Sequence, residues 1–250
     1  MKKKKTVKEA IQQITTEPKP DQLNLSTYFA TPIFSIEKPE WVDSANKVCD
    51  KFIEQAKENN KQAIKDREKE LGKKVGDFGM SHHSVSLIGI PELAELQSYV
   101  GQTSWNILDN MGYDLTNYEL FFTEFWVQEF SEKGGGHHEG HVHYDNHISG
   151  FYFLKCSEKT SMPVFHDPRP AKLMSELPEI DEKQVTFASR LIHYKPKPGT
   201  LIFIPAYLEH QYAVDNGIEP FRFIHFNLQA VRRMITNAVR EQTKSGGSGS

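Results

Sequence analysis

The sequence is poor in cysteine and has no long apolar run. It contains two cysteines, Cys49 and Cys156, which are far apart and form no CxxC motif, so a disulfide framework is not expected. No stretch is apolar enough to span a bilayer, and the residues after Lys2–Lys5 are polar, unlike those of a signal peptide. These absences predict a cytoplasmic protein that does not contact membranes.

The chain also lacks a strong excess of charge of either sign. It has 30 lysines and arginines against 33 aspartates and glutamates, a formal net charge of −3 at pH 7. A balance of this kind gives no indication of general affinity for nucleic acid.

The domain organisation is predicted to be simple. Residues 1–25 are polar and offer little to bury, so we expect a mobile N-terminal segment. Residues 245–250 read SGGSGS, which resembles an artificial flexible linker. The remainder, residues 26–244, is long enough for one domain with a sizeable core.

Apolar residues recur at helical spacing in the N-terminal half. They predict a helix that starts near Pro39, with an apolar face made of Trp41, Ala45, Val48, Phe52 and Ala56. The charged stretch 57–74 is a solvated continuation of this helix or a loop. A second helix is predicted over 92–110, with Gly112 just past its end.

The C-terminal half changes to short segments rich in aromatic and β-branched residues, separated by turn signals. Strands are predicted over 118–130, 148–155, 162–166, 186–194, 200–204, 210–214 and 221–231, and a terminal helix over 231–243. Many short strands after a helical region favour a mainly β fold, a β-sandwich or jelly roll with the N-terminal helices packed outside.

Histidine is concentrated in one segment. Five of the eleven histidines lie in the stretch GGGHHEGHVHYDNHISG, residues 134–150. Imidazole binds first-row metals, and two histidines with one carboxylate favour iron(II). If this stretch were a strand, His143 and Asp145 would point to the same face and could hold one ion.

A third ligand must come from elsewhere in the chain. His210 follows the apolar run Leu201–Ile204 and starts a predicted strand. Arg222 begins another strand twelve residues later, where its guanidinium could bind the far carboxylate of a dicarboxylic cosubstrate. The order HxD, His, Arg is more specific than HxD alone.

Two other arrangements remain open. The first is an all-histidine site, in which His141, His143 and His147 join His210 as in cupins. The second takes His137-His138-Glu139 as the ligand motif, which we consider weaker because it adjoins the glycines and is expected to be a loop. A solvated loop without a specific metal site is the simplest structural interpretation.

Several motifs together resemble the Fe(II)/2-oxoglutarate-dependent oxygenases, and a branch of them found in bacterial and phage genomes. They span most of residues 28–231: TPIF at 31–34, HVHYDNHISGFYFLK at 141–155, FHDPRP at 165–170, KPGTLIFIP at 197–205 with His210, and RFIHFN at 222–227.

The resemblance implies a double-stranded β-helix, a cupin-like jelly roll. It implies that His143, Asp145 and His210 bind Fe(II), and that Arg222 binds 2-oxoglutarate. The family's tyrosine near the cosubstrate is replaced, because strand parity puts Ser149 rather than Tyr152 on the side of the metal. Ser149 is therefore a second predicted cosubstrate contact.

The predicted activity is that of a 2-oxoglutarate-dependent dioxygenase, a hydroxylase that uses O₂ and forms succinate and CO₂. Its substrate, a protein or a small molecule, is not identified by the sequence, and neither is an oligomeric state. The rival hypotheses are a cupin-type metalloenzyme that does not use 2-oxoglutarate, and a non-enzymatic β-sandwich of a virion or other assembly.

Overall fold

The computed structural model describes residues 24–174 and 177–234. The chain divides into two compact units, and the boundary between them in the sequence falls between Ala30 and Thr31. In the first unit, residues 24–30 form neither helix nor strand. The predicted mobile segment 1–25, linker 245–250 and terminal helix 231–243 lie wholly or largely outside the described residues. No helix in the described part is long and apolar enough to cross a membrane.

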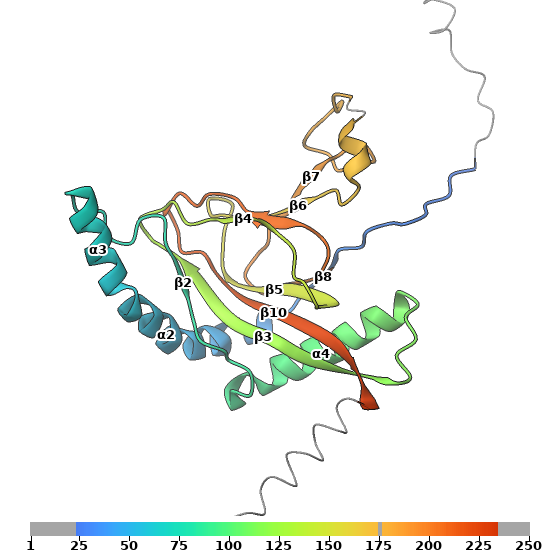
Figure 1. Ribbon diagram of the computed structural model, residues 1–250, viewed down its shortest axis with the longest axis horizontal. Coiled ribbons are helices and arrows are strands. Elements are labelled where there is room, and N and C mark those ends of the chain that lie inside the picture. The colour runs from blue at the N-terminus through green and yellow to red at the C-terminus, as the bar shows by residue number, and fades with distance from the viewer. Residues whose placement is uncertain (1–23, 175–176, 235–250) are drawn as a thin grey trace, which may run out of the picture. The chain divides into compact units, whose positions relative to one another are not determined.

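The second unit is built on two antiparallel sheets (Figure 1). The larger sheet has the order β1-β8-β5-β10-β3-β2 and the smaller one has the order β4-β9-β6-β7. The strands are β1 (Phe34–Glu37), β2 (Ser81–His83), β3 (Tyr118–Phe130), β4 (His138–His141), β5 (Ile148–Lys155), β6 (Pro163–His166), β7 (Leu191–His193), β8 (Thr200–Pro205), β9 (His210–Tyr212) and β10 (Arg222–Arg232). The mainly β fold is confirmed.

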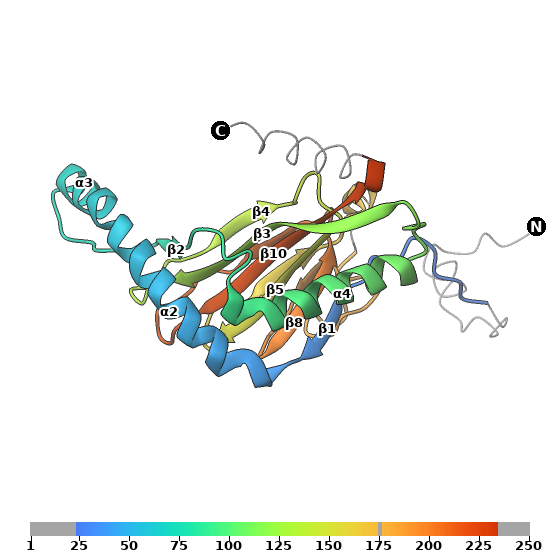
Figure 2. The ribbon, with the colours of Figure 1, turned by 90° about the horizontal axis from the view of Figure 1, so that it is seen from below.

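Two long helices, α2 (Val42–Asn59) and α4 (Ala94–Asn110), lie along one face of the larger sheet, as the sequence predicts (Figure 2). A shorter helix, α3 (Lys61–Leu71), follows α2, and short 3₁₀ turns are found at η1 (Pro39–Trp41), η2 (Pro91–Leu93) and η3 (Pro170–Met174). The charged stretch that follows α2 is helical as α3, and no side chain of α3 is buried. Gly112 has a φ of 90° just after α4, a conformation in which glycine is favoured.

Alternation along the central strands gives the larger sheet two apolar faces. On β10, Ile224, Phe226 and Leu228 belong to the cluster that packs under the helices. Phe221 and Phe223 belong to a second cluster, which is shared with strands of the smaller sheet. Because successive side chains on a strand point to opposite faces, β10 contributes to the helix side and to the space between the sheets.

The strand predictions were accurate at β3 and β5 and too long at β7. The predicted strand 186–194 is reduced to Leu191–His193. The segment around His138, expected as a loop, is instead the strand β4. His143 and Asp145 were placed on a strand, and this was wrong because they lie in the loop between β4 and β5. Asp145 has a φ of 61° in the turn of that loop, so strand parity does not relate its side chain to that of His143.

Candidate metal centre

Two groups of potential metal ligands share His143. One group contains His141, His143 and His210, and the other contains Glu124, His143 and His225. Within each group the ligand atoms lie within 4.8 Å of one another. His143 is common to both groups and is therefore the centre of the site.

His143 and His210 face each other, as the sequence predicts for two ligands of one ion. Their Nε2 atoms are 3.3 Å apart. His210 is fully buried at the start of β9, and its Nδ1 lies 2.9 Å from the carbonyl oxygen of Leu208. His141 pairs with His210 in the register of β4 with β9, which brings the third imidazole of this group into place.

The other group stands on the central strands of the larger sheet. β3 and β10 are paired so that Glu124 lies opposite Asn227, and His225 lies two pairs away, on the same face of β10 as Asn227. Glu124 Oε2 is 3.4 Å from His225 Nε2 and 2.7 Å from Asn227 Nδ2. The same Asn227 nitrogen is 2.9 Å from His143 Nδ1, so Asn227 links Glu124 to His143.

The electrostatics of the site keep His143 and His210 neutral. Burial, together with the nearby histidines, lowers the pKa of each of these two side chains to about 3. The contact with His225 is the largest influence on Glu124 and lowers the pKa of its carboxyl to about 2. At neutral pH the site therefore offers nitrogen lone pairs and one carboxylate, the donor set that divalent first-row metals need.

Asp145 is not part of this constellation. Its side chain is exposed in the turn, and its carboxylate belongs to neither group of ligands. His147 is also outside both groups, and its Nδ1 accepts a hydrogen bond from the backbone N–H of Ala230. The roles of Asp145 and His147 as ligands stay predictions. His141, the other histidine of the all-histidine alternative, has a ligand atom within 4.8 Å of those of His143 and His210.

Arg222 lies on the opposite face of the larger sheet from the histidines. Its guanidinium contacts Asp50 and Asn46 of α2, at 2.7 and 3.1 Å, and the buried carboxylate of Glu129. The predicted contact with 2-oxoglutarate would require these ion pairs to break and the side chain to cross the sheet, so it stays a prediction without support in this conformation.

Ser149 lies on the inner face, together with Phe151 and Phe153 of β5. It is fully buried opposite Asn227, and its Oγ has no hydrogen-bond partner among the described residues. Tyr152 points to the helix side, where its hydroxyl donates to the carbonyl oxygen of Lys38. Ser149 and Tyr152 thus point to opposite faces, as strand parity predicts, and the role of Ser149 as a cosubstrate contact stays a prediction.

Sequence reasoning missed Glu124, His225 and Asn227 as members of the site. Alternation along β3 and β10 places each of them on the inner face, and this signal was available in the sequence. What the sequence did not contain was the register that sets Glu124 opposite Asn227, because pairing between strands a hundred residues apart is a tertiary property.

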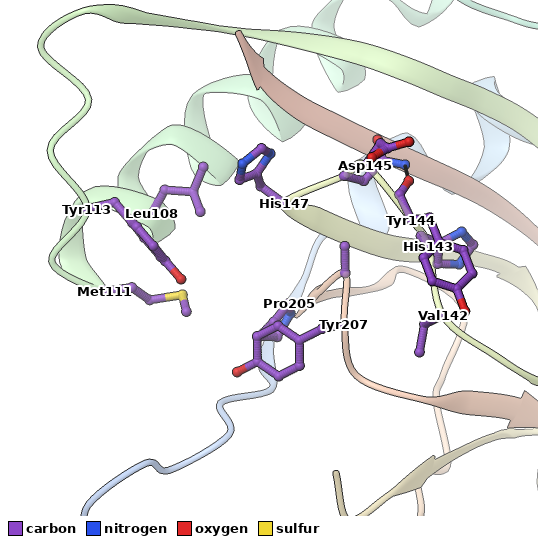
Figure 3. A pocket seen from close by; sticks show the side chains of 12 residues that line it. Leu108, Met111, Tyr113, Val142, His143, Tyr144, Asp145, His147, Pro205 and Tyr207 are labelled. Atoms are coloured by element: carbon purple, nitrogen blue, oxygen red, sulfur yellow. Dashed lines mark hydrogen bonds between the residues drawn. The ribbon is translucent and has the colours of Figure 1, made fainter. Parts of the chain in front are cut away.

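A pocket of about 310 Å³ adjoins His143 (Figure 3). Its walls come from the loop 142–147, from the end of α4 with the residues that follow it, and from the turn after β8. The side chains that line it are largely apolar or aromatic, including Met111, Tyr113, Tyr144 and Tyr207. A concave apolar pocket beside a cluster of convergent polar groups is the usual setting of a small-molecule site.

Comparison with known proteins agrees with this geometry. Residues 124–227 match the model of a family described as "Putative 2OG-Fe(II) oxygenase". No curated protein matches the sequence.

Among solved structures, the non-heme alpha ketoglutarate dependent carbocyclase SnoK of nogalamycin biosynthesis is similar, with 9% identity, a TM-score of 0.50 and coverage of 81% of this chain and 82% of that one. A Pseudomonas putida prolyl-4-hydroxylase has 8% identity, a TM-score of 0.48 and coverage of 80% and 93%. HygX from Streptomyces hygroscopicus, with nickel and 2-oxoglutarate bound, has 9% identity, a TM-score of 0.46 and coverage of 80% and 83%.

At such identities the similarity to SnoK bears on the fold alone, and it agrees with the predicted double-stranded β-helix. The family match bears on the region of the site, because it begins at Glu124, ends at Asn227 and includes every histidine of both ligand groups. This segment of the chain, residues 124–227, is therefore similar to the family of putative 2OG-Fe(II) oxygenases.

Proposed function

We propose that the protein is an Fe(II)- and 2-oxoglutarate-dependent dioxygenase that hydroxylates a protein side chain or a small molecule. One observation carries this proposal: neutral imidazoles and an ionised carboxylate converge on His143 inside the segment that matches the oxygenase family. The structure offers the two groups that share His143 as candidate iron ligands, whereas the sequence motif names His143, Asp145 and His210.

The residues present fit a divalent metal. Their lone pairs are not blocked by protonation at neutral pH, and the buried Oγ of Ser149 and Oδ1 of Asn227 have no partners in the described part of the chain. Buried polar atoms without partners are rare and are often explained by a ligand. Together with 2-oxoglutarate and O₂, bound iron(II) supplies an oxidant for C–H bonds. The protein's own contribution is to hold the metal beside the pocket that adjoins His143.

The residues present fit 2-oxoglutarate less well, because its far carboxylate needs a cationic or strongly donating partner. Arg222 faces α2, where its guanidinium pairs with Asp50 and Glu129, so in this conformation it does not supply that partner. This observation favours a second candidate function, a metal-dependent enzyme that does not use 2-oxoglutarate.

Succinate formation tests the proposal. The wild-type protein, supplied with iron(II), 2-oxoglutarate, ascorbate and O₂, is expected to form succinate, with a basal rate even in the absence of substrate. His143→Ala should abolish the reaction, whereas His137→Ala should not, because His137 is an exposed histidine of the same segment outside both ligand groups.

The alternatives predict different results. If the wild type takes up iron but forms no succinate across a broad substrate screen, the function independent of 2-oxoglutarate is favoured. If protein purified without oxygen takes up no metal at all, the chain is not a metalloenzyme and the non-enzymatic hypothesis gains.

A further inference from the structure

We propose that the pocket beside His143 binds the substrate, and that this substrate carries a positively charged amine. The rings of Tyr113, Tyr144 and Tyr207 contact the ammonium group, and the apolar side chains of the pocket cover its carbon chain. This inference rests on the proposed function, because it names the substrate class of the same enzyme. The amine belongs to a lysine side chain of a protein or to a free small molecule, since both present the same group.

Three exposed tyrosines from separate parts of the fold meet at this pocket (Figure 3). Tyr113 follows α4, Tyr144 lies in the loop between β4 and β5, and Tyr207 follows β8. Their exposed fractions are 51%, 84% and 54%. Among the described residues, none of these rings stacks on another aromatic ring, and none of their hydroxyls forms a hydrogen bond. Aromatic side chains left exposed together around a hollow indicate a surface that a ligand covers.

The lining of the pocket contains no lysine or arginine. Its only carboxylate is that of Asp145. Of its two histidines, His143 is a candidate metal ligand, and imidazole binds metal in its neutral form. His147 is neutral because its Nδ1 accepts a hydrogen bond from the backbone N–H of Ala230 and therefore carries no proton. A cationic substrate thus meets no positively charged side chain in the lining.

The same bias continues in the chain beside the pocket. Within two residues of the lining residues, the sequence contains Asp109, Asp114, Asp145 and Glu209 and no lysine or arginine. All four carboxylates are exposed. The whole chain, in contrast, has 30 lysines and arginines against 33 aspartates and glutamates. A cleft bordered by charges of one sign raises the local concentration of the opposite ion, which here is a cation.

Ring chemistry and size select an ammonium group among cations. The face of a tyrosine ring is negative and attracts a cation, and several rings together form an aromatic cage. The loaded centre does not reverse this preference, because iron(II), one carboxylate ligand and the two carboxylates of 2-oxoglutarate leave a net negative charge. A volume of about 310 Å³ is at the small end for ligand pockets, so the pocket fits one side chain or a small amine.

Nuclear magnetic resonance of the tyrosine rings tests the proposal without turnover. Zinc(II)-loaded protein with isotope-labelled tyrosine, and metal-free protein in parallel, would be titrated with tetramethylammonium and with tert-butanol. The two probes have similar shapes, only the first is charged, and the first has no lone pair for a metal. Tetramethylammonium is expected to bind at least tenfold more tightly than tert-butanol. It should shift the ring signals that are lost in Tyr113→Phe, Tyr144→Phe and Tyr207→Phe.

Removal of one ring should weaken the binding of the cation alone. Tyr207→Leu keeps an apolar side chain and is expected to weaken tetramethylammonium binding about threefold, the value of one exposed cation–π contact, with tert-butanol binding unchanged. Phe187→Leu is the matched control, because it removes an exposed ring that does not line the pocket. Tyr144→Leu, at the most exposed of the three tyrosines, is the second variant if Tyr207→Leu does not fold.

Two further probes distinguish the sources of the amine, and either result supports the proposal. Tighter binding of a blocked Gly-Lys-Gly peptide than of butylammonium assigns a protein substrate, and the reverse or equal binding assigns a free amine.

Other outcomes overturn the proposal. These are equal binding of tetramethylammonium and tert-butanol, or tetramethylammonium binding that neither Tyr207→Leu nor Tyr144→Leu weakens. Failure of the proposed function is a separate result. A protein that binds tetramethylammonium at these tyrosines but forms no succinate retains the cation site and loses only the assigned reaction, whereas one that forms succinate without binding tetramethylammonium retains the reaction and loses this substrate class.

Discussion

Arg222 and Glu129 form a buried ion pair across the paired strands β10 and β3. Arg222 Nη2 lies 2.6 Å from Glu129 Oε2, and both side chains are 3% exposed. Lys57 of α2 also contacts Glu129, and Asp50 of α2 contacts Arg222. The arginine that the sequence suggests as a cosubstrate contact therefore fastens a helix to the outer face of the sheet.

The first prediction concerns this ion pair. Arg222→Met should lower the free energy of unfolding by about 3 kcal/mol, because the buried carboxylate of Glu129 would lose its buried partner. Lys57 and Lys155 also pair with Glu129. The expected loss of stability is therefore at the lower end of the range found when one partner of a buried ion pair is removed. Urea denaturation measures the effect, and Arg169→Met, which removes an exposed guanidinium paired with Asp167, should lower the free energy of unfolding less than Arg222→Met does. A stable Arg222→Met protein that no longer binds 2-oxoglutarate would instead support the cosubstrate role.

The second prediction concerns acid stability without metal. The pKa of His210 is about 3 in the folded protein, below the value of about 6.5 expected in the unfolded chain. Between these values the unfolded state binds the additional proton, so stability is complete above pH 6.5 and is lost as the pH falls. The contribution of His210 between pH 7.5 and 5.5 is about 1.4 kcal/mol. Denaturation in the presence of a chelator at pH 7.5 and at pH 5.5 measures how much stability is lost between the two pH values. This loss should be about 1.4 kcal/mol smaller in His210→Gln than in the wild type. An equal loss in both proteins would show that His210 does not titrate on unfolding.

The third prediction concerns Gly150 in the middle of β5. A Cβ at this position would lie 2.3 Å from the carbonyl oxygen of Ile202 and 2.3 Å from the ring of Phe226. Gly150→Ala should therefore lower the free energy of unfolding by about 3 kcal/mol, the upper range of overpacking. Gly101→Ala is the matched control, since its Cβ would meet only Phe122 at 3.8 Å. Alanine in a helix should stabilise the protein by up to about 1 kcal/mol. Similar stabilities of the two variants would contradict this packing.

The fourth prediction concerns Ser149. Its buried hydroxyl has no partner in the described residues, so Ser149→Ala should leave the free energy of unfolding within about 1 kcal/mol of wild type. If 2-oxoglutarate binds here, the same variant should bind it about tenfold more weakly, the value of one hydrogen bond. Calorimetric titration of the cobalt(II)-loaded protein with 2-oxoglutarate measures the affinity. An unchanged affinity would exclude a contact between Ser149 and the cosubstrate.

Local sequence signals determined much of this protein by themselves. Helical spacing located α2 and α4, and the density of aromatic and β-branched residues located β3 and β5 with their observed bounds. Strand parity alone predicted that the side chains of Ser149 and Tyr152 point to opposite faces of the sheet. The histidine-rich stretch and His210 were found because the residue type itself carries the chemistry.

The tertiary structure decided how these parts are combined. The loop between β4 and β5 removes Asp145 from the ligand groups, and a left-handed turn of this kind has no strand periodicity to read. Pairing of β3 with β10 brings Glu124 to Asn227 across more than a hundred residues of sequence. Alternation along β10 puts Arg222 on the helix side, and the placement of α2 supplies its partners Asp50 and Asn46 there. These relations depend on register and on helix placement, which follow from burial summed over the whole domain and not from any single segment.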